Sequence, residues 1–311
     1  MSSQDAYASV YTGVLRIGRS DRGVLRVTGA DRFEWLQGLV TNDVRLVTPG
    51  HRVYAAWLTP QGRMITDLWL VGAEAAVLLD VPAALAPSLA ARLDGLVFSE
   101  DVQVTDVTAE VPVTECLGAG GACGLSASGV TVDSLVYARP SIVAYGPWET
   151  VADEQHLPVL REAMPAGLDV LEVLRIEAGI PAFGLDIDTD TIPLEAGLES
   201  RAISFTKGCY VGQELIVRVT QRGGGRVVRH LAGLALDRPL SPGTALPREV
   251  QAGGRTVGRL TSATWSPRLG HAVALAMLHR DHLTPGHQVE VSDPAGPVTA
   301  RVVALPMSVA S

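Results

Sequence analysis

The sequence predicts a mixed fold, with two α+β units followed by an all-β part at the C-terminus. The 311 residues exceed what one hydrophobic core usually supports, and 47% of them are hydrophobic against 19% charged, which is ample material for several packed units. Strand and helix patterns alternate in the first two thirds of the chain, and short strands with turn signals follow. We therefore expect an α+β region at residues 1–225, with subdomains at roughly 1–110 and 111–225, and a small barrel or sandwich at residues 226–311.

The first subdomain begins with a strand and a helix. Residues Gly23–Ala30 alternate apolar and polar side chains, as a half-buried strand does. The stretch DRFEWLQGLVTNDV follows, with Asp31 and Glu34 at capping-box spacing, and this predicts a helix over residues 31–44. The further expected elements are strands at 53–59, 64–71 and 75–81, a turn at Pro60–Arg63, a helix from Pro82 with a stripe of Leu85, Leu89, Leu93 and Leu96, and a closing strand at 100–108.

The second subdomain contains the strongest helix signal of the chain. Val170, Leu174 and Ala178 repeat at helical spacing within Leu168–Ile180, and Gly179 with Pro181 forms a stop signal. The polar stretch 186–200 has no period and predicts a long loop, a kind of segment that often carries function. The other expected elements are a strand pair within 130–146, a helix near 154–164, a hinge or hairpin tip at 221–226, and C-terminal strands within 226–237, 254–266, 271–278, 287–293 and 297–305.

Charge and cysteine content place the protein among cytoplasmic proteins. A net charge of −8 argues against binding nucleic acid through the overall field, although arginines crowd together on what we expect to be a solvated strand pair. An odd cysteine count without paired spacings predicts neither a disulfide framework nor a structural metal site. The first 13 residues lack a secretory signal, and no apolar run is long enough for a membrane helix. The crowded arginines are Arg218, Arg222, Arg226 and Arg229, and the three cysteines are Cys116, Cys123 and Cys209.

The stretch FTKGCYVGQE holds the only lysine of the chain, two residues before a cysteine. A thiol reacts as its thiolate, and a nearby cation lowers a thiol pKa, which is one use for Lys207 beside Cys209. On a strand these two side chains would point the same way. The alternative is a tight turn that carries a small buried residue. The sequence leaves open whether Cys209 is a nucleophile, a redox thiol or a transient metal ligand.

Three further groups of polar residues are candidates for function. Arg175 and Glu177 lie in the strong helix, where a forked guanidinium suits a carboxylate ligand and an exposed ion pair is the alternative. Glu195 in the polar loop accepts hydrogen bonds from a heterocycle or caps a helix. Thr66 and Asp67 follow the turn at Pro60–Arg63, and we interpret Asp67 as a structural hydrogen-bonding residue.

Six pieces of the chain, in this order, resemble the folate-binding YgfZ family. This family is a branch of the superfamily that includes the T-protein aminomethyltransferase of glycine cleavage. The pieces span roughly residues 23 to 280, and the fifth of them is specific to the branch. They are DRFEWLQGLVTNDV, LTPQGRMITDL, LRIEAGIPAFG, IPLEAGL, KGCYVGQE and GRLTSATWSPRLGHAVALAML.

The resemblance implies a T-protein-like, three-part ring: two α+β units around a central folate cavity, and a C-terminal β-barrel. It implies that tetrahydrofolate or a one-carbon derivative binds and that Arg175 holds its glutamate tail. Cys209 with Lys207 would form the reactive pair beside the cavity. We expect Glu177, Glu195, Tyr210 and Gln213 to contact the folate as well.

Family members support the assembly or repair of iron–sulfur cluster enzymes, some of which modify tRNA. The resemblance therefore implies iron–sulfur client or assembly proteins as partners, without direct contact to nucleic acid or membrane. We expect a monomer, because no heptad pattern or long exposed apolar edge stands out.

One departure separates the branches of the superfamily. Aminomethyltransferases carry two acidic residues where this chain has Thr66 and Asp67, and the resemblance places the catalytic carboxylate at the first of them. A threonine provides no carboxylate, which disfavours aminomethyl transfer. A folate-dependent one-carbon transferase is nevertheless the alternative hypothesis, and a binding module that lost its chemistry is the third.

Overall fold

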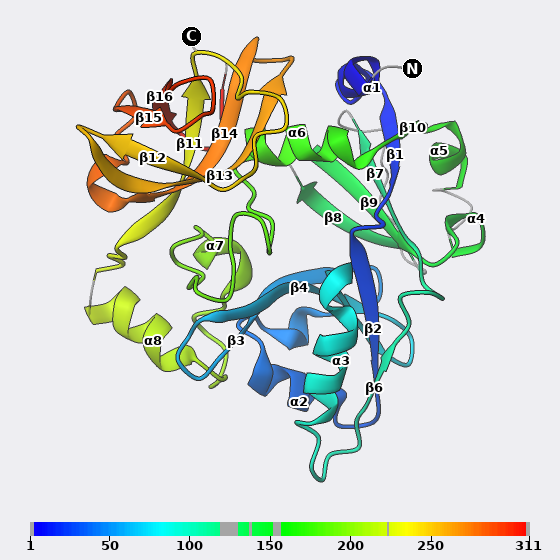
Figure 1. The fold of residues 1–311 in the computed structure, drawn as a ribbon. Coiled ribbons are helices and arrows are strands. Elements are labelled where there is room, and N and C mark those ends of the chain that lie inside the picture. The colour runs from blue at the N-terminus through cyan, green and yellow to red at the C-terminus, as the bar shows by residue number, and fades with distance from the viewer. Residues whose placement is uncertain (1–2, 119–129, 137–138, 152–156, 223, 309–311) are drawn as a thin grey trace. The chain divides into compact units, whose positions relative to one another are not determined.

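The computed structural model describes residues 3–118, 130–136, 139–151, 157–222 and 224–308 (Figure 1). They divide into two compact units, which we call the first unit (Met1–Leu168 and Glu199–Leu215) and the barrel unit (Asp169–Leu198 and Ile216–Ser311). This division differs from the predicted boundary after residue 225. The reason is helix α6 (Leu168–Ala178), whose Ile176 packs in one cluster with barrel residues Val273 and Leu275.

The first unit contains two five-stranded sheets. One is antiparallel throughout and has the strand order β3-β4-β5-β2-β6. Its strands are β2 (Arg22–Thr28), β3 (Arg52–Leu58), β4 (Met64–Gly72), β5 (Val77–Pro82) and β6 (Gln103–Asp106). Helices α2 (Arg32–Leu39) and α3 (Ala86–Asp94) cover one of its faces, and η1 (Val44–Leu46) and η2 (Ala83–Leu85) are short 3-10 turns. The five strands of this sheet and helices α2 and α3 were expected from the sequence pattern.

The second sheet has the order β10-β1-β7-β9-β8, with β1 and β10 parallel and the other pairs antiparallel. Its strands are β1 (Val14–Gly18), β7 (Val113–Gly118), β8 (Val130–Val136), β9 (Arg139–Tyr145) and β10 (Met164–Ala166). Valines of both sheets, among them Val24, Val71 and Val143, form one buried cluster. The other helices assigned wholly to this unit are α1 (Ser3–Ser9), α4 (Trp148–Val151), α5 (Leu157–Glu162) and α7 (Glu199–Ala202).

Helix α2 is shorter than predicted, and its start differs from a capping box. It ends at Leu39 because Val40 adopts an extended conformation and bridges Trp57 of β3. The side chain of Asp31 makes no capping bond to the helix and instead accepts the main-chain N–H of Asp101. The carbonyls at the C-terminal end of α2 therefore need donors from elsewhere in the unit.

The described residues of the barrel unit form a closed six-stranded antiparallel barrel with the order β11-β14-β13-β12-β15-β16. The predicted all-β part is therefore a barrel. Its elements are β11 (Arg229–Leu236), β12 (Arg248–Ala252), β13 (Arg255–Ser266), β14 (His271–His279), η4 (Arg280–His282), β15 (Gln288–Val291) and β16 (Val298–Val303). Helix α6 ends one residue before Gly179, which has a left-handed φ of +73°, so the predicted stop signal is confirmed.

The arginine-rich stretch is helical in its first part, up to Arg222, rather than a strand pair. Helix α8 (Gln213–Val217) continues into the π-helical turn η3 (Arg218–Arg222), and the chain then turns at Gly224 and Gly225 before β11 begins. Gly223, within the predicted hinge, lies outside the described residues. The hydroxyl of Thr220 donates to the carbonyls of Ile216 and Val217 one turn earlier, which is a contact of the helical conformation that replaces the expected strand.

Candidate functional site

Two neighbouring strands of the first unit carry a polar face. In the β3–β4 pair, Tyr54 lies opposite Trp69 and Ala56 lies opposite Asp67. Side chains alternate along a strand, so Tyr54, Asp67 and Trp69 share one face of the sheet. Thr66 is on the opposite face, which α2 and α3 cover. Thr66 and Asp67 therefore point to different environments.

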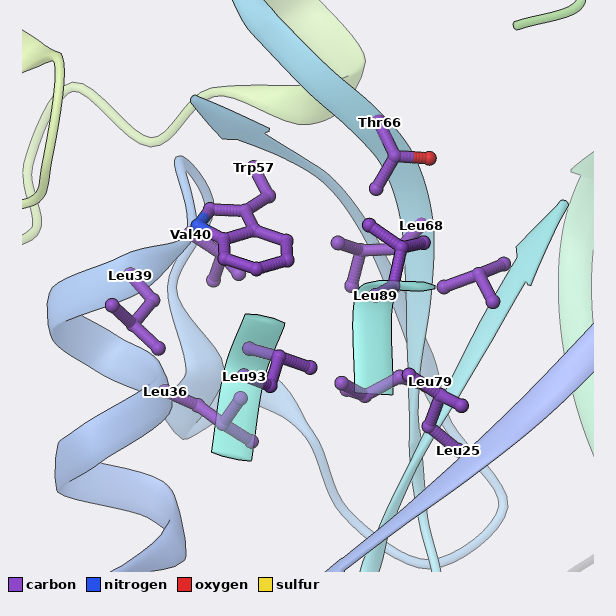
Figure 2. Close-up of a pocket in the computed structure, with 11 residues that line it drawn as sticks. Leu25, Leu36, Leu39, Val40, Trp57, Thr66, Leu68, Leu79, Leu89 and Leu93 are labelled. Carbon is purple, nitrogen blue, oxygen red and sulfur yellow. The ribbon is translucent and has the colours of Figure 1, made fainter. Parts of the chain in front are cut away.

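Thr66 is turned into the apolar core. It is completely buried, and its hydroxyl donates to the main-chain carbonyl of Asp67 at 2.9 Å. Figure 2 shows it beside leucine, valine and tryptophan side chains that line a cavity of about 10 Å³. A space of that size holds at most one water molecule. The cavity is a packing gap, and Thr66 has no access to a ligand through it.

Asp67 carries the carboxylate of the polar face. Its Oδ2 accepts the hydroxyl of Tyr54 at 2.8 Å, while its Oδ1 is buried without a hydrogen-bond partner among the described residues. Burial, with the negative charge of Asp67 next to it, raises the pKa of Tyr54 well above its ordinary value, so the hydroxyl stays a donor. A buried carboxylate oxygen that lacks a donor costs free energy, which a ligand N–H would recover.

Tyr54 also lines a pocket of about 260 Å³ in the same unit. The guanidinium of Arg52 lies 4.0 Å from the ring centre of Trp69, and that of Arg201 lies 5.3 Å from the ring centre of Tyr54. Asn42 completes this wall, because its amide donates to the main-chain carbonyls of Tyr54 at 2.8 Å and of Arg201 at 3.1 Å. Two cations beside two aromatic rings suit a planar ligand that carries negative charge.

Lys207 contacts main-chain carbonyls rather than a thiolate. Its Nζ donates to the carbonyls of Gln37 at 2.8 Å, Val40 at 2.7 Å and Asn42 at 2.8 Å, which uses all three N–H groups of the ammonium. The side chain is 6% exposed, and burial lowers the pKa of Lys207 to about 8. The expected strand through Lys207 and Cys209 is wrong, because residues 203–210 form no strand and the two side chains differ in burial.

Cys209 is exposed in an irregular segment that is fixed at both ends. The N–H of Ser204 donates to the carbonyl of Thr41, and the N–H of Val211 donates to the carbonyl of Gly38. Two apolar side chains of the same segment are also exposed, Phe205 to 57% and Val211 to 38%. The sulfur atom is therefore exposed on a segment whose backbone is held at both ends.

The other two predicted residues of the KGCYVGQE motif lie at its end. Tyr210 is buried, its ring centre is 5.3 Å from Nζ of Lys207, and burial raises the pKa of Tyr210 to about 12. Gln213 begins α8 and is half-buried. Their predicted contact with folate stays a prediction.

Arg175 is fully engaged within the barrel unit. Its Nε and NH2 donate to the carboxylate of Glu172, both at 2.6 Å, and NH2 also reaches the hydroxyl of Ser262. NH1 donates to Asp186 at 2.6 Å and to the carbonyl of Ile180 at 3.2 Å. All five N–H groups thus have protein acceptors. The side chain connects α6 to the following loop and to β13, which leaves no donor for a folate tail.

The two predicted glutamates also have protein partners. Glu177 is 4% exposed and accepts hydrogen bonds from Ser266 and, at 3.3 Å, from Arg268. Glu195 accepts the main-chain N–H of Ile192 and forms an ion pair with Arg229 at 3.1 Å. Both have partners within the barrel unit, and their expected contacts with folate stay a prediction.

The described residues contain no group of three or more His, Cys, Asp or Glu side chains arranged to hold a metal ion. Within the same part of the chain, no helix is long and apolar enough to cross a membrane. Cys123 lies outside the described residues, and Cys116 is completely buried in β7.

Comparison with known proteins assigns the fold and the family. The N-terminal domain of the glycine-cleavage T-protein matches residues 3–122, and the T-protein C-terminal barrel domain matches residues 229–308. Aminomethyltransferase of Moorella thermoacetica is 30% identical over 320 residues, with 92% of this chain and 84% of that protein covered. A Synechococcus aminomethyltransferase is 31% identical, with 88% and 81% covered. The chain belongs to the aminomethyltransferase family.

The chain is also similar to one solved structure and to one protein with a different name. The crystal structure of aminomethyltransferase T from Bartonella henselae superimposes with a TM-score of 0.82 at 19% identity, covering 98% of this chain and 89% of that one, which shows the fold alone. An iron–sulfur cluster assembly factor, the mitochondrial IBA57 homologue of Mycosarcoma maydis, is 31% identical over 65% of this chain and 53% of its own length.

Sequence reasoning missed the polar wall of this aminomethyltransferase-like unit. Tyr54, Asn42 and Arg201 were not singled out, because each stands in an ordinary local context and their meeting depends on long-range packing. One signal was available: Tyr54 and Trp69 alternate with small or apolar residues on two strands joined by the Pro60–Arg63 turn. That pattern identifies a shared face, although it does not say what covers that face.

Proposed function

We propose that the protein binds tetrahydrofolate and supports iron–sulfur cluster enzymes, with Cys209 as its working thiol. The observation that carries the proposal is the exposed Cys209 on a segment that is fixed at both ends and that also exposes Phe205 and Val211. Folate use accompanies the aminomethyltransferase family, and the partial likeness to an iron–sulfur assembly factor supports the client class. The KGCYVGQE motif supports the YgfZ branch.

The folate site in this proposal is the polar wall of the first unit. The aromatic rings of Tyr54 and Trp69 provide faces for a flat heterocycle, and the free Oδ1 of Asp67 accepts one of its N–H groups. Arg52 and Arg201 contribute positive charge for the carboxylates of the ligand. This assignment differs from the expected one at Arg175, all of whose N–H groups have protein acceptors, while contacts of Glu177 and Glu195 with folate stay a prediction.

The proposed role of Cys209 requires only one thiol. Stable cluster ligation uses several thiolates, so Cys209 alone does not hold a cluster within one chain. Transient ligation, nucleophilic attack and redox exchange remain open for it, and each requires an accessible sulfur atom. Clients that modify tRNA are included in the proposal as proteins, without contact between this chain and RNA.

Two measurements test the two halves of the proposal. Calorimetric titration with reduced tetrahydrofolate should give saturable binding that Asp67→Asn weakens. In a deletion strain, Cys209→Ser should fail to restore iron–sulfur enzyme activity, whereas Cys116→Ser, at a buried cysteine of the same chain, should restore it. Full restoration by Cys209→Ser would show that the thiol is dispensable, and absent binding up to millimolar folate would remove the ligand from the proposal.

A second candidate function is folate-dependent aminomethyl transfer. Asp67 favours it, because a buried carboxylate with one free oxygen is suited to orient a folate nitrogen and stabilise developing positive charge. The argument against it from Thr66 loses its force, since Thr66 lies on the other face of the sheet. Transfer of an aminomethyl group by the unmodified protein, abolished in Asp67→Asn, would establish this function in place of the first.

A further inference from the structure

We propose that Lys207 is a positioning residue, which fastens the segment carrying Cys209 to the C-terminal end of α2 and to Asn42 of the ligand pocket. The inference rests on the proposed function for the importance of Cys209. In this inference the single lysine of the chain does not activate the thiol. It links the segment that carries Cys209 to the pocket that Asn42 lines.

The first step is the hydrogen-bond requirement at the end of α2. The last carbonyls of a helix have no partner within it, and the chain turns extended at Val40. Gln37, Val40 and Asn42 direct their carbonyls to one point, where Nζ of Lys207 lies within 2.7–2.8 Å of all three. An ammonium presents three donors around one nitrogen, whereas a guanidinium presents a flat fork. Lysine therefore fits this point and arginine does not.

The second step concerns the backbone on either side of Lys207. Ser204 and Val211 are bound through their N–H groups to Thr41 and Gly38, and the hydroxyl of Ser204 accepts the N–H of Lys207 at 3.2 Å. The segment from residue 204 to residue 211 is thus fixed at its ends and in its middle. Cys209 lies between the last two fixed points, with its side chain exposed.

The third step leads from Lys207 to the pocket. Asn42 gives its main-chain carbonyl to Lys207 and uses its side-chain amide to hold the carbonyls of Tyr54 and Arg201. Tyr54 and Arg201 both line the pocket. Loss of the ammonium would therefore disturb the cysteine segment and the pocket wall together. Activation of a thiol predicts no such effect on the pocket.

The test separates charge from geometry by comparing Lys207→Met with Lys207→Arg. Amide hydrogen exchange should accelerate about tenfold or more over residues 37–42 and 204–211 in both variants, because neither can serve three convergent carbonyls. Exchange in β14 of the barrel unit should stay unchanged, which distinguishes a local role from general destabilisation. Arg45→Met, which removes an exposed neighbouring cation, should leave all these segments as they are.

The alkylation of Cys209 by iodoacetamide gives the second readout. The pH at half-maximal rate should be the same in the native protein, Lys207→Met and Lys207→Arg. A rise of one pH unit or more in Lys207→Met, with Lys207→Arg like the native protein, would mean that the positive charge activates the thiol, and the proposal would be overturned. Normal exchange over residues 204–211 in Lys207→Met would overturn it as well.

A measurement on the unsubstituted protein covers the case in which the variants do not fold. Selective ¹³C labelling of lysine yields one side-chain signal, because Lys207 is the only lysine. Carbamidomethylation of Cys209 should leave the pH midpoint of that signal unchanged, since coupled groups shift one another reciprocally and the ammonium is bonded to three carbonyls rather than to the thiol. A drop of half a pH unit or more would contradict the proposal. Neither outcome depends on whether folate binds or iron–sulfur enzymes need the protein.

Discussion

The phenolic hydroxyl of Tyr54 donates to Oδ2 of Asp67 over 2.8 Å, and the other carboxylate oxygen is buried without a partner in the described part of the chain. We expect Asp67→Asn to weaken tetrahydrofolate binding by about tenfold or more, because a hydrogen bond to a charged group is worth about 1.5–3 kcal/mol. Isothermal titration calorimetry measures the change.

The matched control is Thr66→Val on the same strand. Thr66 faces the apolar core, and valine keeps its shape, so folate affinity should stay within twofold of the native value. If Thr66→Val weakened binding and Asp67→Asn did not, the ligand would contact the other face of the sheet.

The sequence of strand β4 predicted only part of the arrangement of this site. The sequence identified β3 and β4 and the turn between them, and alternation places Thr66 and Asp67 on opposite faces. Which face meets a ligand depends on what packs there, and α2 and α3 decide this by covering the Thr66 side. That information lies in contacts between distant segments, which local patterns do not contain.

The pH dependence of stability should report the burial of Lys207. Its pKa is lowered to about 8 in the folded chain, from an ordinary value of 10.5. Below pH 8 both states bind the proton, and the folded state bears the full cost of burying the charge. Between pH 8 and 10.5 the unfolded state binds more protons, so the free energy of unfolding should rise with pH in this window.

Urea unfolding at a series of pH values, with Lys207→Met as reference, measures this contribution. The difference between the native protein and Lys207→Met should change across that window, and the lysine ¹³C signal should titrate near pH 8. A midpoint near 10.5 would mean that burial does not lower the pKa of Lys207 in solution, and the predicted pH dependence of stability would be wrong.

The contacts of Lys207 could not be predicted from the motif alone. The KGCYVGQE motif was singled out from the sequence, and the structure shows that its cysteine is exposed. The role of its lysine was not predictable from spacing, because the three acceptors come from residues 37–42, which lie about 165 positions earlier in the sequence. The barrel and the helix stop at Gly179, in contrast, follow from periodicity and turn chemistry within single segments.

Arg175→Ala should destabilise the barrel unit. The substitution leaves Asp186, which is completely buried, without its charged partner, and removing one member of a buried pair costs about 3–5 kcal/mol. Arg259→Ala is the matched control, because Arg259 and Asp188 form a partly exposed ion pair and its loss should cost less than about 1 kcal/mol. Urea unfolding followed by circular dichroism measures both. An Arg175→Ala protein of native stability that no longer binds folate would restore the role predicted from sequence.

The glycines of the KGCYVGQE motif should differ in their tolerance of alanine. Gly212 has a φ of +84°, and a Cβ there would lie 2.5 Å from the carbonyl oxygen of Thr59 in the turn between β3 and β4. Gly212→Ala should therefore destabilise the first unit by at least the backbone cost of about 1–3 kcal/mol, because that carbonyl oxygen belongs to the backbone and has to shift. Gly208→Ala is the control, since no described atom lies within 4 Å of its Cβ position, and its effect should stay within about 0.5 kcal/mol. Equal stability of the two variants in thermal unfolding would mean that the motif does not pack on this turn; a large loss in Gly212→Ala alone would fix the motif to the strands that carry Tyr54 and Asp67.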